Sequence, residues 1–167
     1  MFAIDVTVEN WDWLQNSCLL KSIKMLLNML FDFDPITGKV SNPKSLLENN
    51  VIIDFVEFSP NSKILYGSSG KHLYQFDLLA GDIAASKLIV SEMDVLAQGL
   101  QLGINNKIYQ TAFGATPVLS VINKPNVLGI GCDYRIEEVP LKYGYQFYAL
   151  PSFCASYFNQ IIIENNL

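Results

Sequence analysis

The sequence has no cluster of positive charge. Its 11 Lys and Arg residues are scattered among 16 Asp and Glu residues, and the formal net charge is −5. Proteins that bind nucleic acid, or that bind an acidic membrane surface by electrostatics, concentrate positive charge on one surface. The sequence therefore predicts no nucleic-acid partner and no attachment to an acidic membrane.

Cysteine and histidine are equally scarce. The three cysteines, Cys18, Cys132 and Cys154, form no CxxC motif and cannot all be paired, and His72 is the only histidine. Metal sites and hydrolase triads need several such side chains that act together. We therefore predict no catalytic residue, no metal site and no cofactor. Cys132 and Cys154 are interpreted as small buried apolar residues, and His72 as an exposed residue of a turn.

Long apolar segments are missing as well. The start of the chain, MFAIDVTVENWDW, lacks the basic and apolar regions of a signal peptide. No apolar run reaches the roughly 18 residues that a membrane-spanning helix needs. We therefore predict no signal peptide in this chain and no membrane insertion. Half of the residues are hydrophobic, which is ample for a folded core.

An internal repeat stands out against these absences. LFDFDPITGKV from Leu30 matches LYQFDLLAGDI from Leu73, about 43 residues later. VEFSPNSKILYGSS from Val56 matches LQLGINNKIYQTAF from Leu100, about 44 residues later, and LSVINKPNVLG from Leu119 then takes the place of the segment at Leu73. A period of about 40–45 residues with four strands per repeat is typical of a β-propeller blade.

One repeat unit divides into four short strands with turn residues between them. The strands are expected at IIDFVEF from Ile52, KILYGSS from Lys63, GKHLYQFDL from Gly70 and IAASKLIV from Ile83. We therefore predict an all-β fold, a partial β-propeller of about three four-stranded antiparallel blades over residues 30–160. A β-sandwich is the alternative, but it does not require a repeat of fixed period.

The two ends of the chain depart from the repeat. Residues 1–29 form an atypical N-terminal segment, which is either a degenerate blade hairpin or a capping helix. The helix is suggested by apolar residues near helical spacing, namely Leu14, Cys18, Leu19, Ile23, Leu26, Leu27 and Leu30. Residues 161–167 are expected to be a C-terminal tail or linker.

Five segments carry a family resemblance. They are FDFDPITGKVSN at 31–42, VEFSPNSKILYGSSGKHLYQFDL at 56–78, LQLGINNKIY at 100–109, VINKPNVLGIGCDY at 121–134 and LPSFCASYF at 150–158. In order and spacing they resemble the propeller-like region, with WD40- or YVTN-type repeats, of large bacterial surface proteins that carry type IX secretion (gliding-motility-associated) sorting domains. The resemblance implies an extracellular or cell-surface location and a propeller that binds protein or glycan.

The expected function is therefore a non-catalytic binding or scaffold module. About three blades cannot close a ring, and open blades expose faces and strand edges, so a homo-oligomer that completes the ring is the expected assembly. The alternatives are a propeller enzyme of lyase or lactonase type, and a truncated remnant with no independent function.

Aromatic residues gather near the C-terminus and are the candidates for ligand contact. We single out Tyr143, Tyr145 and Tyr148, with Trp11 and Trp13 as a weaker second candidate. Aromatic-rich surfaces bind partners, although packing in the core is the simpler explanation for such residues.

Several acidic residues receive structural interpretations. Asp34 and Asp77 stand four residues before Gly38 and Gly81, so we expect each Asp to accept backbone N–H bonds in a turn. The adjacent Glu137 and Glu138 are expected to face opposite sides of a charged loop or edge strand, where they cannot act as an acid–base pair.

Overall fold

The computed structural model describes residues 29–34, 36–46, 53–145 and 149–150. These residues form three antiparallel sheets and one short 3₁₀ turn, so the predicted all-β fold is confirmed. The choice between hairpin and helix for the N-terminal segment falls outside the described residues. So do Trp11, Trp13, Cys18, Tyr148, Cys154 and the tail at 161–167.

The first sheet is a hairpin of β1 (Met29–Asp34) and β2 (Lys39–Ser45). Its turn contains Gly38 at φ 67°, a left-handed conformation that glycine adopts without steric cost. The sequence predicts a four-stranded blade here, whereas the described residues give two strands. The other strands of this expected unit fall outside the described residues.

Two four-stranded sheets follow, and each is a simple meander in which strands adjacent in sequence are hydrogen-bonded neighbours. The first contains β3 (Phe55–Phe58), β4 (Ile64–Ser69), β5 (His72–Asp77) and β6 (Leu88–Glu92). The second contains β7 (Ala97–Leu102), β8 (Ile108–Ala112), β9 (Val118–Ile122) and β10 (Tyr134–Pro140), with the 3₁₀ turn η1 (Gly129–Cys132) before β10. Both sheets correspond to repeat units found in the sequence.

The strand expected from Ile83 begins five residues later, at Leu88. Local side-chain hydrogen bonds explain the difference. Asp82 Oδ1 accepts the Ala85 N–H at 3.0 Å, and Ser86 Oγ donates to the Ile83 carbonyl at 2.6 Å. Asp and Ser compete with strand pairing in this way, so they prolong the turn through Ser86.

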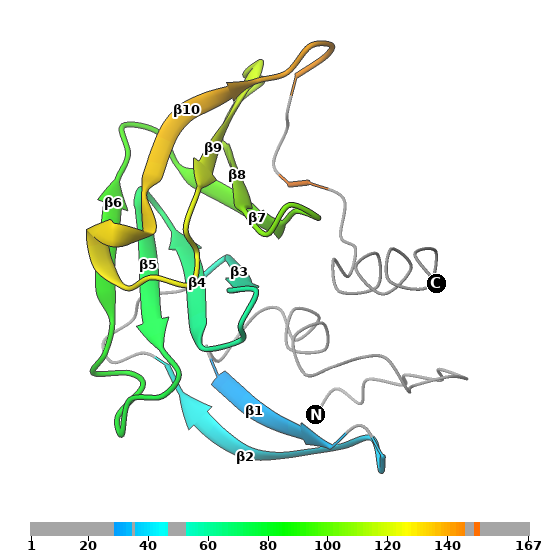
Figure 1. Cartoon of the computed structure of the whole chain (residues 1–167), viewed down its shortest axis with the longest axis vertical. Helices are drawn as coiled ribbons and strands as arrows, with labels where there is room; N and C mark the ends of the chain where they lie inside the picture. Colours follow the sequence, from blue (N-terminus) through cyan, green and yellow to red (C-terminus); the bar gives the residue numbers. More distant parts are fainter. Residues whose placement is uncertain (1–28, 35, 47–52, 146–148, 151–167) are drawn as a thin grey trace, which may run out of the picture.

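The three sheets follow one another along the molecule, with β3–β6 in the middle (Figure 1). Because side chains alternate along a strand, the middle sheet has two apolar faces. Leu65, Tyr74 and Phe76 lie in a buried cluster with Leu46, beside the first hairpin. The opposite face contributes Ile64, Tyr66 and Leu73 to a second buried cluster, which is completed by Leu100, Ile108, Ile122 and Cys132 of the second four-stranded sheet.

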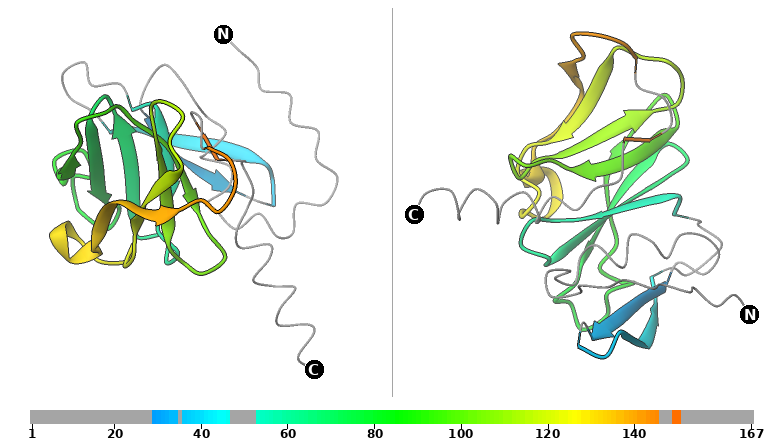
Figure 2. Two further views of the ribbon diagram at one scale, coloured as in Figure 1. Left: turned by 90° about the horizontal axis from the view of Figure 1, so that it is seen from above. Right: turned by 90° about the vertical axis from the view of Figure 1, so that its right-hand side faces the viewer.

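The first strands of the two four-stranded sheets are placed alike. Val56 and Phe58 of β3 pack in the cluster beside the first hairpin, whereas Leu100 and Leu102 of β7 pack in the cluster shared with β3–β6. Each sheet thus turns the same positions of its first strand toward the sheet before it. β7 also packs against β3 and β4, and the described sheets form an open stack rather than a closed ring (Figure 2).

Candidate functional site

Two of the three candidate tyrosines are described, and both are exposed. Tyr143 is 83% and Tyr145 is 69% exposed, on either side of Gly144 at φ 82°. The segment is anchored just before them, because the Leu141 N–H donates to the Pro117 carbonyl at 2.7 Å. Lys142 Nζ lies 5.2 Å from the centroid of the Tyr143 ring. The result is a solvent-facing pair of phenol rings with a cation beside one of them.

The two turn aspartates act as the sequence predicts, but their glycines differ. Asp34 Oδ1 accepts the Ile36 N–H at 2.9 Å, and Asp77 Oδ1 accepts the Leu79 N–H at the same distance. The hydroxyl of Thr37 also donates to Asp34, and these hydrogen bonds lower the pKa of the Asp34 carboxyl. Gly81 lacks the left-handed backbone of Gly38, so the turn after Asp77 does not require glycine there.

His72 is not the exposed turn residue that we expected. It is the first residue of β5 and half-buried, with its ring centroid 5.6 Å from that of Tyr74. Its Nε2 lies 3.8 Å from Glu92 Oε1 on the neighbouring β6. The turn is formed by Gly70, at φ 56°, and Lys71, and the strand pairing already includes His72.

Glu137 and Glu138 lie on β10, the edge strand of the second four-stranded sheet, so the expected edge-strand location is confirmed. A β-bulge interrupts the pairing between Arg135 and Val139, with Glu137 at φ 51°, and both glutamates are exposed. Alternation is a property of a regular strand, so the opposite facing of these two side chains stays a prediction.

Cys132 is fully buried, as the sequence predicts. Burial raises the pKa of its thiol, so the nucleophilic thiolate is disfavoured. Burial likewise raises the pKa of the neighbouring Tyr66 phenol. These two residues form part of the packing between the sheets rather than a reactive site.

Sequence reasoning missed a polar contact between the two four-stranded sheets. The side chain of Gln75 donates to the Val127 carbonyl at 2.9 Å and to the Tyr66 hydroxyl at 2.8 Å. Its Oε1 accepts the Gly129 N–H at 2.7 Å, and Tyr66 in turn donates to the Pro125 carbonyl at 3.0 Å. One signal was present: alternation places Gln75 on the same face as the apolar Leu73, where a polar side chain needs partners.

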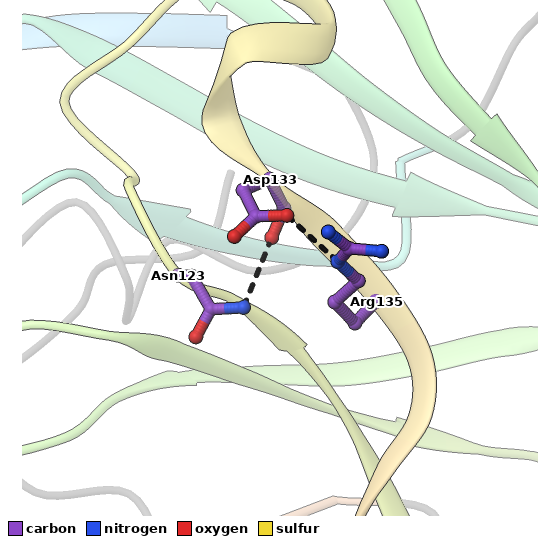
Figure 3. A network of polar contacts seen from close by, with 3 residues as sticks. All are labelled: Asn123, Asp133 and Arg135. Carbon is purple, nitrogen blue, oxygen red and sulfur yellow. Dashed lines mark hydrogen bonds and ion pairs between the residues drawn. The ribbon is translucent and has the colours of Figure 1, made fainter.

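The loop that receives these hydrogen bonds is closed at its base (Figure 3). Asn123 Nδ2 donates to the Asp133 carbonyl at 3.3 Å, and Arg135 Nε lies 2.7 Å from Asp133 Oδ1. The Lys124 N–H also donates to the Cys132 carbonyl at 2.9 Å. Residues 124–132 are thus pinned at both ends, which presents Val127 and Gly129 to the first four-stranded sheet.

Within the ranges that the structure describes, no group of three or more His, Cys, Asp or Glu side chains is placed to hold a metal ion. No helix in these same ranges is long and apolar enough to cross a membrane. Comparisons with protein-family models, with curated proteins and with solved structures found no match. The resemblance to bacterial surface proteins therefore stays a prediction.

Proposed function

We propose that the chain is a non-catalytic binding or scaffold module of a cell-surface or secreted protein, built from consecutive blades of β-propeller type. Its location rests on the resemblance of the five sequence segments. Its ligand is a glycan or a protein surface, contacted through Tyr143 and Tyr145. The missing part of the ring is supplied by a second copy of the chain.

The stacking of the sheets supports the propeller part of this proposal. In a propeller, each four-stranded blade packs one face on the preceding blade and the other on the following one. The equivalent placement of Val56 with Leu100, and of Phe58 with Leu102, has this head-to-tail character. A β-sandwich, by contrast, packs the two inner faces of its sheets against each other.

The observation that carries the binding function is the exposure of Tyr143 and Tyr145. Tyr66 and Tyr74 are buried in the described core, which is the usual place for large aromatic rings in a small domain. Two neighbouring exposed tyrosines offer apolar faces, hydroxyl groups and little side-chain entropy to lose, and such residues are enriched at binding surfaces.

Binding to a panel of bacterial surface polysaccharides, measured by titration calorimetry, tests this proposal. We expect at least one polysaccharide to bind, and Tyr143→Ala with Tyr145→Ala to weaken its affinity by about tenfold or more. Ile104→Ala, at an exposed apolar residue of the 103–107 turn, is the matched control and should bind as wild type. Unchanged affinity in the double variant would exclude this surface, and turnover of an ester or glycan substrate would overturn the non-catalytic assignment.

A further inference from the structure

The outer strand of the first four-stranded sheet, β6, has an open edge. Among the described residues it pairs with β5 on one side and with no strand on the other. Ile89 on this strand is 60% exposed, and Leu88 is exposed as well. An exposed, apolar edge strand is a template for pairing with another chain.

The other sheet edges of the two larger sheets are protected. β10 exposes one apolar side chain, Ile136, but it also presents Arg135, Glu137 and Glu138 to solvent and ends at Pro140, which has no N–H to donate. β3 and β7 pack against each other in the interior of the stack. β6 thus combines a free edge with two adjacent exposed apolar side chains, Leu88 and Ile89, whereas the single exposed apolar side chain of β10, Ile136, lies among charged residues.

The side chains on one face of β6 form a self-complementary series. Ile89 pairs with Tyr74, and Glu92 pairs with His72. Glu92 is three positions after Ile89, whereas Tyr74 is only two positions after His72, because a bulge in β6 inserts one extra residue. Tyr74 and His72 are two residues apart on β5, so Ile89 and Glu92 occupy successive positions on the same face. Lys87, immediately before the first residue of β6, lies on the same face, since its Nζ is 5.6 Å from the centroid of the Tyr74 ring.

We propose that β6 is a homodimer interface, in which a second copy of this chain pairs antiparallel to β6 about Ile89. A two-fold axis at Ile89 places the two Ile89 side chains opposite each other. It also places Lys87 of each copy opposite Glu92 of the other, so that both ends of the paired strands carry opposite charges. Cross-strand pairs of this kind stabilise a sheet, whereas like charges directly opposite each other destabilise it.

The reverse face of β6 adds apolar surface to the same interface. Leu88 lies on that face, since it pairs with Gln75, and η1 packs beside β6. Ile130 of η1 is 94% exposed, and Leu128 just before it is exposed too. Antiparallel pairing of two copies brings a second strand alongside this surface, which removes apolar area from water on both faces of the joined sheet.

This interface differs from the contact that would complete a propeller ring. Ring completion uses the faces of blades at the ends of the stack, whereas β6 lies at the outer rim of the middle sheet. The inference is therefore independent of the proposed binding function, and either of the two can fail alone.

Light scattering on the full chain over a range of concentrations tests the interface. The monomer mass is 18.7 kDa, and we expect wild type to show twice the mass of Ile89→Lys at the same concentration. Ile104→Lys introduces the same change at a residue with nearly equal exposure, 59%, in the 103–107 turn, and should associate as wild type. A wild type that stays monomeric, or an Ile89→Lys variant with the same mass as wild type, would overturn the proposal.

Charge exchange provides a second test that does not depend on an apolar change. Lys87→Glu and Glu92→Lys should each weaken self-association by about tenfold or more, because each places two pairs of like charges across the interface. An equimolar mixture of the two variants should regain wild-type association, since every pair is again of opposite charge. A mixture that associates no better than either variant alone would contradict pairing through β6.

Discussion

The two four-stranded sheets have the same strand order, yet the hairpins formed by their first two strands differ in register by one residue. In the first sheet Phe58 pairs with Leu65 across the hairpin. In the second, the equivalent Leu102 pairs with Ile108, although the sequence repeat would pair it with Tyr109. A one-residue change of register moves side chains to the opposite face of the sheet.

The difference in register determines which side chains each sheet contributes to the core between the sheets. Ile64 and Ile108 are equivalent in the repeat, but Ile64 faces the following sheet and Ile108 faces the preceding one, so both lie in the same buried cluster. The next equivalent pair, Tyr66 and Gln110, is likewise buried. Tyr66 has polar partners, whereas Gln110 Nε2 has none among the described residues. The sequence repeat thus determines where the strands lie, whereas the register of each hairpin determines which side chains point to each face of the sheet.

The largest loss of stability is expected at Tyr66, whose hydroxyl is hydrogen-bonded, unlike the amide nitrogen of the equivalent Gln110. Tyr66→Ala should lower the free energy of unfolding by about 3–5 kcal/mol, because it opens a cavity between the sheets and removes the phenol's hydrogen bonds. Urea denaturation measures this loss. Ile104→Ala, at an exposed turn residue, should stay within about 0.5 kcal/mol of wild type. A loss below about 1 kcal/mol for Tyr66→Ala would mean that the two sheets do not pack as described.

An intermediate effect is expected at the two buried amides. Gln75→Leu leaves the Gly129 N–H and the Val127 carbonyl without their partner, which should cost about 1–3 kcal/mol in urea denaturation. Gln110→Met removes an amide whose nitrogen is already unpaired, and the Tyr134 hydroxyl that bonds its oxygen keeps Met93 Sδ at 3.2 Å, so the loss should be smaller than for Gln75→Leu. Equal losses of stability in the two variants would show that the two amides contribute alike, which contradicts the difference described between the sheets.

The smallest effect appears only at alkaline pH. Burial raises the pKa of Tyr134 from 10.0 to about 12, and its hydroxyl donates to Gln110 Oε1. The unfolded chain therefore loses this proton first, and stability should fall as the pH rises from about 10 to about 12. Tyr134→Phe should make the fall shallower in urea titrations over this range. An unchanged pH profile would show that Tyr134 does not titrate as a buried group.

Much of this fold could be predicted from the sequence where local chemistry decides it. Asp34 and Asp77 close turns through their own backbone neighbours, and the meander order follows from the repeat. The late start of β6 was missed because Asp82 and Ser86 hold their local hydrogen bonds through residues that periodicity marks as strand. The register of β7 and β8 could not be predicted, since Ile108 and Tyr109 are both acceptable partners for Leu102 in sequence alone.

The position of the candidate site in the sequence could be predicted, but the exposure of its side chains could not. The tyrosines near the C-terminus are visible in the sequence, but composition does not distinguish a packed ring from an exposed one. Tertiary structure makes that distinction, exposing Tyr143 and Tyr145 while burying Tyr66. The bulge around Glu137 and Glu138 depends in the same way on the pairing of β10 with β9.

Amide hydrogen exchange at Gly129 tests the stacking of the two sheets most directly. Gly129 is the first residue of η1, and its N–H donates to Gln75 Oε1 of the other four-stranded sheet at 2.7 Å. Its protection from exchange therefore depends on contact between the sheets. We predict slow exchange in wild type and fast exchange in Gln75→Leu, with the β4 and β5 amides still protected in both. Exchange of the wild-type Gly129 amide at the rate of an unstructured chain would contradict the stacked arrangement.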